Sequence, residues 1–111
     1  MAHEFYYSHP NCNKELRKRR IGFANLKGTH KKKEWDEMKS FFNICVRCEG
    51  ENGYINMDKD HIIPVYQGGS NSIKNLQPLC PKCNASKGPE NTDHRIIFAQ
   101  KHGLILKPEW L

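Results

Sequence analysis

Long apolar segments are missing from this chain of 111 residues. Its apolar runs, such as Phe41-Phe42 and Ile62-Ile63, are far shorter than the roughly 20 residues that a membrane-spanning helix needs. The first residues, Met1 to Glu4, include an acid and lead into no apolar stretch, so we expect no secretory leader. These absences predict a cytoplasmic protein with no membrane partner, in which thiols stay reduced.

The sequence also has little material for a core and few acidic side chains. Hydrophobic residues make up 37% of the chain, and domains this short are often held together by a metal or by disulfides. Lys and Arg number 18 against 12 Asp and Glu, which gives a formal net charge of +6. This excess favours nucleic acid as partner, ahead of an acidic membrane surface or of a charge that serves only solubility.

Composition divides the chain into three parts. Residues 1–33 are expected to be a basic arm, whose runs 14–20 and 30–33 either contact phosphates or are simply solvated. Residues 34–90 carry the cysteine pairs and should form the compact core. Residues 91–111 should form a C-terminal helix and a tail that packs back on the core.

Local patterns predict helices at both ends of the core and short strands between them. Trp35, Met38 and Phe42 share one face of a helix expected over 34–43. Strands are expected at 54–57 and 60–65, then a loop over 67–71 and a short turn from Ser72 to Leu76. A helix should open at Cys80 to Cys83 and end near Gly88. The last helix should be capped by Asn91 or Thr92 and end at Gly103.

Four cysteines form two Cys-x-x-Cys pairs, Cys45 with Cys48 and Cys80 with Cys83. In a reduced compartment this pattern favours one tetrahedral zinc site over free or redox-active thiols. A four-thiolate site leaves no position for water, so it should be structural. The fifth cysteine, Cys12, has no such pairing; it is either an unpaired thiol or a spare ligand with His9.

Between the two pairs lies Asp60-His61. A neutral histidine can take a proton from water near neutral pH, and a carboxylate is a hard oxygen ligand for Mg²⁺ or Mn²⁺. Hydrolysis of a phosphodiester uses both, a base for the water and a cation for the leaving oxygen. Asp58 is a spare ligand candidate, and Lys82 and Lys87 either hold phosphate or are solvated. In a regular strand Asp60 and His61 would face opposite sides, so the strand pattern alone does not show how both could act on one phosphate.

The order of residues D-H-I-I-P-V-x-x-G-G-S-x-S-x-x-N-L-x-x-L-C-x-x-C-N-x-x-K-G, within Cys45 to Gly88, resembles the HNH endonucleases, in the branch with a four-cysteine zinc. The resemblance implies an α+β fold, a small ββα-metal core with a four-cysteine structural zinc, flanked by helices. It implies that His61 is the general base, that Asp60 and Asn84 hold the catalytic metal, and that Asn75 pins the loop and helps to orient the histidine. Asn84 stands where the family name has histidine, which favours hard ions such as Mg²⁺ or Mn²⁺.

These patterns predict a metal-dependent DNA endonuclease. Because one ββα site cuts one strand per encounter, a monomer or weak dimer should nick, leaving 5′ phosphates as the family implies. Small stand-alone HNH proteins often sit beside packaging genes in bacteriophages, so the resemblance also suggests phage packaging proteins as partners in a host cytoplasm. The alternatives are a non-catalytic zinc module that binds DNA or a partner protein and, more weakly supported, a redox protein using the cysteine pairs.

Overall fold

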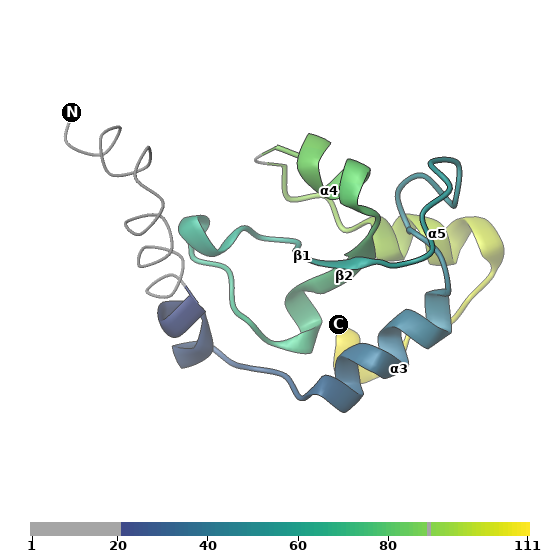
Figure 1. Ribbon diagram of the computed structural model, residues 1–111. Helices are drawn as coiled ribbons and strands as arrows, with labels where there is room; N and C mark the ends of the chain where they lie inside the picture. Colours follow the sequence, from purple (N-terminus) through teal and green to yellow (C-terminus); the bar gives the residue numbers. More distant parts are fainter. Residues whose placement is uncertain (1–20, 89) are drawn as a thin grey trace.

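The computed structural model describes residues 21–88 and 90–111 (Figure 1). Its helices are α3 (Lys32–Phe42), α4 (Pro81–Ser86) and α5 (His94–His102), and its strands are β1 (Asp58–His61) and β2 (Leu76–Leu79). Three short 3-10 turns complete it: η1 (Val65–Gln67), η2 (Ile73–Asn75) and η3 (Pro108–Trp110). Residues 21–26 are also helical. The basic run 14–20, His9 and Cys12 lie outside the described residues.

Helix α3 confirms the helix expected from the spacing of Trp35, Met38 and Phe42, all three of which are buried. It begins at Lys32, slightly before the expected Glu34, because the Glu34 carboxylate accepts a hydrogen bond of 2.9 Å from the Lys31 backbone N–H. It ends where Asn43 adopts a left-handed backbone with φ of 61°. The helix thus places one apolar stripe against the rest of the fold.

The sheet differs from the expected strands. Residues 54–57 form no strand, and β1 covers 58–61 rather than 60–65. Its antiparallel partner is β2, which sets Asp60 opposite Gln77 and His61 opposite Leu76. Strand β2 escapes sequence patterns because all four of its residues are buried, so apolar and polar residues do not alternate, and because it contains Pro78. The Pro78 carbonyl faces away from β1 and accepts from the Val46 N–H at 3.2 Å.

Helix α4 begins as expected at the second cysteine pair, with the Cys80 side chain accepting from the Cys83 N–H, and it ends at Ser86. Helix α5 ends at Gly103 as expected, but its cap is Asp93 and not Asn91 or Thr92. The Asp93 carboxylate accepts from the Arg95 backbone N–H at 3.0 Å and pairs with the Arg95 guanidinium at 2.9 Å. A carboxylate that serves both groups makes Asp93 the better cap.

One apolar core joins these elements. The Phe42 ring meets the Phe98 ring of α5 at 5.7 Å and the Trp110 ring of η3 at 5.9 Å, so the C-terminal segment is part of this core. Its buried members are Trp35, Met38, Phe42, Cys45, Val46, Ile73, Leu76, Leu79, Cys80, Cys83, Phe98 and Trp110.

The architecture is the expected α+β fold, with β1, β2 and α4 as the ββα unit. Helices α3 and α4 flank the strands from opposite sides (Figure 1). Within the described part of the chain, no helix is both long and apolar enough to cross a bilayer.

Candidate zinc site and active site

The four cysteines of the two Cys-x-x-Cys pairs meet at one point. The sulfur atoms of Cys45, Cys48, Cys80 and Cys83 all lie within 4.8 Å of one another, and Cys48 Sγ is 3.9 Å from Cys80 Sγ. Zinc bound tetrahedrally at about 2.3 Å from each sulfur would separate the sulfurs by about 3.8 Å. The cluster therefore fits zinc in size and in ligand type, as the zinc branch of the fold implies.

Hydrogen bonds and burial act in opposite directions on these thiols. Burial raises the pKa of Cys80, but hydrogen bonds from the Asn52 side chain, from Cys83 and from Cys48 outweigh it and bring that pKa to about 6. Burial, followed by the neighbouring thiols, raises the pKa of Cys83 to about 12. Burial also raises the pKa of Cys45. Cys80 therefore loses its proton readily, whereas ionisation of all four thiols requires a cation among them.

Residues of the first cysteine pair and the segment after it also contact neighbouring helices. Arg47, between the first two cysteines, donates from Nη1 to the Cys83 carbonyl and to Ser86 Oγ, both at 3.0 Å, and so ties the first pair to α4. Glu49 accepts from Lys101 Nζ and contacts His102 Nε2, both at 2.6 Å, at the end of α5. These two partners hold the pKa of Glu49 below its ordinary value. The first cysteine pair is thus linked to α4 through Arg47 and, through the adjacent Glu49, to the end of α5.

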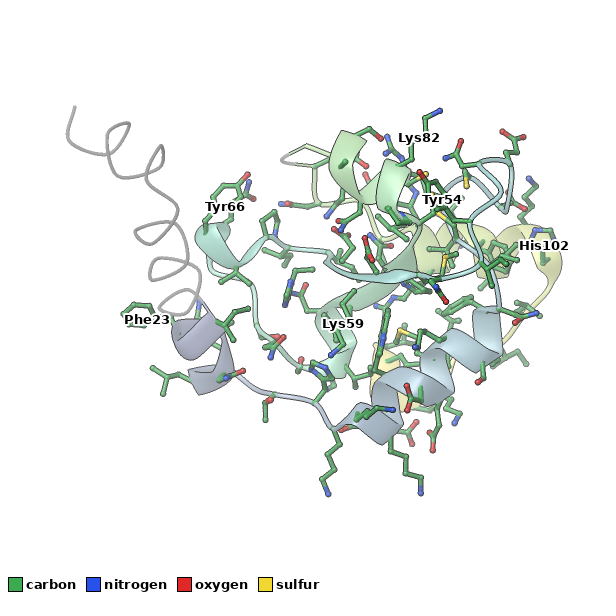
Figure 2. The ribbon with its side chains drawn as sticks, viewed as in Figure 1. Phe23, Tyr54, Lys59, Tyr66, Lys82 and His102 are labelled. Carbon is green, nitrogen blue, oxygen red and sulfur yellow. The ribbon has the colours of Figure 1, made fainter. Side chains whose placement is uncertain are left out.

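The ββα unit carries a second site, which shares no residue with the cysteine cluster. Asp60, His61, Asn84 and Lys87 line one pocket of about 400 Å³, together with residues of the η1 turn such as Tyr66. Figure 2 shows Tyr66 standing out at the tip of this loop. Although neighbours in a strand face opposite sides, His61 is the last residue of β1, and there both side chains reach the same pocket.

Two side chains, the amide of Gln77 and the ammonium group of Lys87, hold the Asp60 carboxylate in place. Gln77 Nε2, directly across the sheet, donates to Asp60 Oδ2 at 2.8 Å, and Lys87 Nζ lies 2.9 Å from the same oxygen. Both of these contacts fall on Oδ2. Sequence reasoning did not single out Gln77, because β2 shows no strand pattern and the contact depends on the pairing of β1 with β2.

Lys87 and Lys82 differ sharply despite their closeness in the chain. The Lys87 side chain is only 2% exposed, and its Nζ also donates to the carbonyls of His61 and Ile62, at 2.9 and 3.1 Å. It is therefore a structural cation of the site, not a solvated lysine. Lys82 is exposed and points outward (Figure 2).

The variant Lys87→Met should destabilise the protein by about 3–5 kcal/mol, because it leaves the buried Asp60 carboxylate without its cation. Urea unfolding of the zinc-loaded protein measures this. The matched change Lys82→Met, at an exposed position, should alter stability by about 0.5 kcal/mol or less. Equal effects for the two variants would contradict the buried ion pair.

Asn75 fastens the loop that follows β1. Its Oδ1 accepts from the Ile63 N–H at 2.9 Å, and its Nδ2 donates to the carbonyls of Ile63 and Ser70, at 3.0 and 2.8 Å. These bonds agree with the loop-pinning part of its expected role. The side chain that touches the His61 ring is Asn71, whose Oδ1 lies 2.9 Å from His61 Nε2.

Gly69 lies so close to this loop that no side chain fits. A Cβ there would stand 1.8 Å from the Ile63 carbonyl oxygen and 2.9 Å from Asn75 Nδ2. We expect Gly69→Ala to cost roughly 3 kcal/mol or more and to displace the Asn75 contacts. Gly22→Ala, where a Cβ meets nothing within 4 Å, is the matched control and should be neutral or slightly stabilising. Thermal unfolding compares the two; a stable Gly69→Ala protein would refute the close approach.

Asn84, the second expected metal ligand, lies on α4 and lines the pocket. Its Nδ2 is 3.5 Å from Asp58 Oδ2, so the amide nitrogen is turned toward Asp58. Asp58 itself is exposed and at the far end of β1 from His61.

Comparison with known families agrees with this geometry. Residues 45–90 match the HNH endonuclease family model. This segment contains the ββα unit and the four-cysteine cluster, which is consistent with the zinc-type branch of that family. Domains of this family are generally metal-binding nucleases. No curated protein and no solved structure matches the chain significantly.

Proposed function

We propose that this protein is a metal-dependent endonuclease that hydrolyses DNA phosphodiester bonds. The observation that carries the proposal is the single pocket in which Asp60, His61 and Asn84 meet, within a segment that matches the HNH endonuclease model. Phosphodiester hydrolysis uses a base for the water and a cation for the leaving oxygen, and two hard oxygen donors can hold such a cation.

The residues present fit a catalytic divalent ion. Asp60 Oδ1 and the Asn84 amide oxygen would hold it, and carboxylate and amide oxygens suit Mg²⁺ or Mn²⁺ better than zinc. When bound, such an ion polarises the scissile phosphate and stabilises the departing 3′ oxygen. Lys87 and Gln77 keep the Asp60 carboxylate oriented toward the pocket. His61 takes the proton from the attacking water, and Asn75 keeps the loop beside it in place.

Exposed lysines around the site would hold the DNA backbone. Lys59 lines the pocket, and Lys27 and Lys82 are exposed on the segments beside it. Contacts of this kind give affinity that falls steeply with salt. We propose further that residues 1–33 act as a basic arm, with 34–90 as the nuclease core and 91–111 as a C-terminal segment. A monomer or weak dimer with one site would nick and leave 5′ phosphates. Phage packaging proteins as partners, in a host cytoplasm, remain part of this proposal.

Conversion of supercoiled plasmid to open circle tests the proposal. The zinc-loaded protein should produce open circles when Mg²⁺ or Mn²⁺ is added and none without an added divalent ion. If no ion supports cutting and the protein still retards DNA in a gel, the function is that of a zinc-containing binding module. That alternative has in its favour the closed zinc site and the net positive charge, neither of which requires catalysis.

A further inference from the structure

Asn71 lies between the His61 ring and the segment of residues 24–30. Its backbone N–H points to the carbonyls of Ala24 and Gly28, at 3.3 and 3.2 Å. Its carbonyl is 2.7 Å from His30 Nδ1, and its side-chain Nδ2 donates to Asn25 Oδ1 at 2.8 Å. Its Oδ1 faces His61 Nε2 at 2.9 Å. Every polar group of Asn71 therefore has a partner, and only one of these partners belongs to the ββα unit.

Residues 24–30 are closely packed on the loop that carries Asn71. Lys27 Nζ donates to the Gly68 carbonyl at 2.6 Å, and a Cβ on Gly28 would stand 3.1 Å from Ser72 Cβ. His30 links this segment to β1 as well, because its Nε2 lies 2.9 Å from Lys59 Nζ on that strand. Figure 2 shows Lys59 projecting from the strand. The segment thus forms a brace that joins the loop to β1 from outside the matched residues 45–90.

The Asn71 amide bridges Asn25 and His61. In the structure its Nδ2 donates to Asn25 Oδ1, and its Oδ1 faces His61 Nε2. An amide oxygen only accepts hydrogen bonds, so the neutral imidazole must carry its proton on Nε2. In a neutral imidazole, the hydrogen bond at one ring nitrogen decides which nitrogen carries the proton. With the proton on Nε2, Nδ1 is the nitrogen that has a free lone pair.

We propose that Asn71, held by residues 24–30, positions His61 by accepting from Nε2–H and so presents Nδ1 as the basic nitrogen. The inference rests on the proposed function of His61 as a base, and it adds a residue to which the resemblance assigns no role. Asn71 is a positioning residue, since it acts on the reaction only through the imidazole. A side chain that holds the base should affect the chemical step more than DNA binding.

Nitrogen-15 spectra of the imidazoles test the tautomer directly. In the zinc-loaded wild-type protein at alkaline pH, where imidazoles are neutral, the His61 signal should show a protonated Nε2 and an unprotonated Nδ1. In Asn71→Ala the signal should move toward the average of the two tautomers, and in Asn71→Asp, which keeps an acceptor oxygen, it should return. A wild-type spectrum with the proton on Nδ1 overturns the inference, whatever the variants do.

Plasmid nicking supplies the second measurement. Asn71→Ala should lower kcat by about 10–100-fold with KM little changed, as is typical when the partner that orients a histidine is removed. Asn71→Asp should recover part of this loss, and the exposed Asn56→Ala should behave as wild type. Unchanged kcat in Asn71→Ala, or a loss that Asn71→Asp does not relieve, contradicts the positioning role.

The two measurements separate this inference from the proposed function. If the wild-type protein cuts no DNA, the proposed function fails, while the spectra still decide whether Asn71 sets the tautomer. If it cuts and the spectra show no effect of Asn71, the inference fails alone. Zinc content and backbone amide spectra verify that Asn71→Ala is folded, and the wild-type spectrum decides the tautomer even if it is not.

Discussion

His61→Ala should lower the rate of plasmid nicking by about 10²–10⁴-fold, the range that a general base contributes. The side chain lines the pocket that holds Asp60 and Asn84, so its removal takes away the proton acceptor and leaves the oxygen donors in place. Zinc content should stay at the wild-type level, because the cysteine cluster shares no residue with this pocket. Single-turnover nicking with Mg²⁺ or Mn²⁺ is the measurement.

His102→Ala is the matched control for this experiment. His102 ends α5 and lies at the opposite end of the molecule from Tyr66, which borders the pocket (Figure 2). Its loss should remove the contact with Glu49 and leave the nicking rate unchanged. Full activity in His61→Ala would exclude His61 as the base, and equal losses in both variants would point to a general effect on folding.

Removal of zinc should unfold the domain. Structural zinc sites contribute an apparent free energy of about 10–16 kcal/mol, which matches or exceeds the whole stability of a typical small domain. Here the cluster also lies within the apolar core, where Cys45, Cys80 and Cys83 are buried. A strong chelator should therefore abolish the cooperative thermal transition, and zinc added afterwards should restore it. Circular dichroism with metal analysis follows both steps.

Cys80→Ser should produce the same loss without a chelator, because Cys80 both belongs to the cluster and caps α4. Cys12→Ser is the matched control, since Cys12 belongs to neither Cys-x-x-Cys pair. It should keep zinc bound and the transition intact. A Cys80→Ser protein that is stable and fully zinc-loaded would argue against the four-thiolate site.

Sequence patterns located those parts of the fold that depend on local spacing. The two cysteine pairs met as expected, and the stripe of Trp35, Met38 and Phe42 became the buried face of α3. Both patterns repeat over a few residues, so a single chain displays them. The pairing of β1 with β2 could not be found in this way, because it joins segments separated by a loop and one of them contains Pro78.

Contacts within the candidate site depended even more on long-range packing. Asp60, His61, Asn75 and Asn84 were named in advance from the resemblance, and their roles stay predictions. Gln77 reaches Asp60 only because the strand register sets the two opposite each other. Asn71 reaches His61 only because the loop folds back. Neither contact follows from neighbours in the sequence.

The amide of Gln77 has two further partners, and they limit where this domain can be cut from the chain. Besides Asp60, its Nε2 donates to the Thr92 carbonyl at 3.2 Å, and its Oε1 accepts from the His94 N–H at 2.9 Å. One side chain therefore links the start of α5 to the carboxylate of the pocket. An engineer who grafts this domain onto a DNA-targeting protein should keep residues 91–110, because a cut at the edge of the matched segment would remove Thr92 and His94 from Gln77, the side chain that holds Asp60.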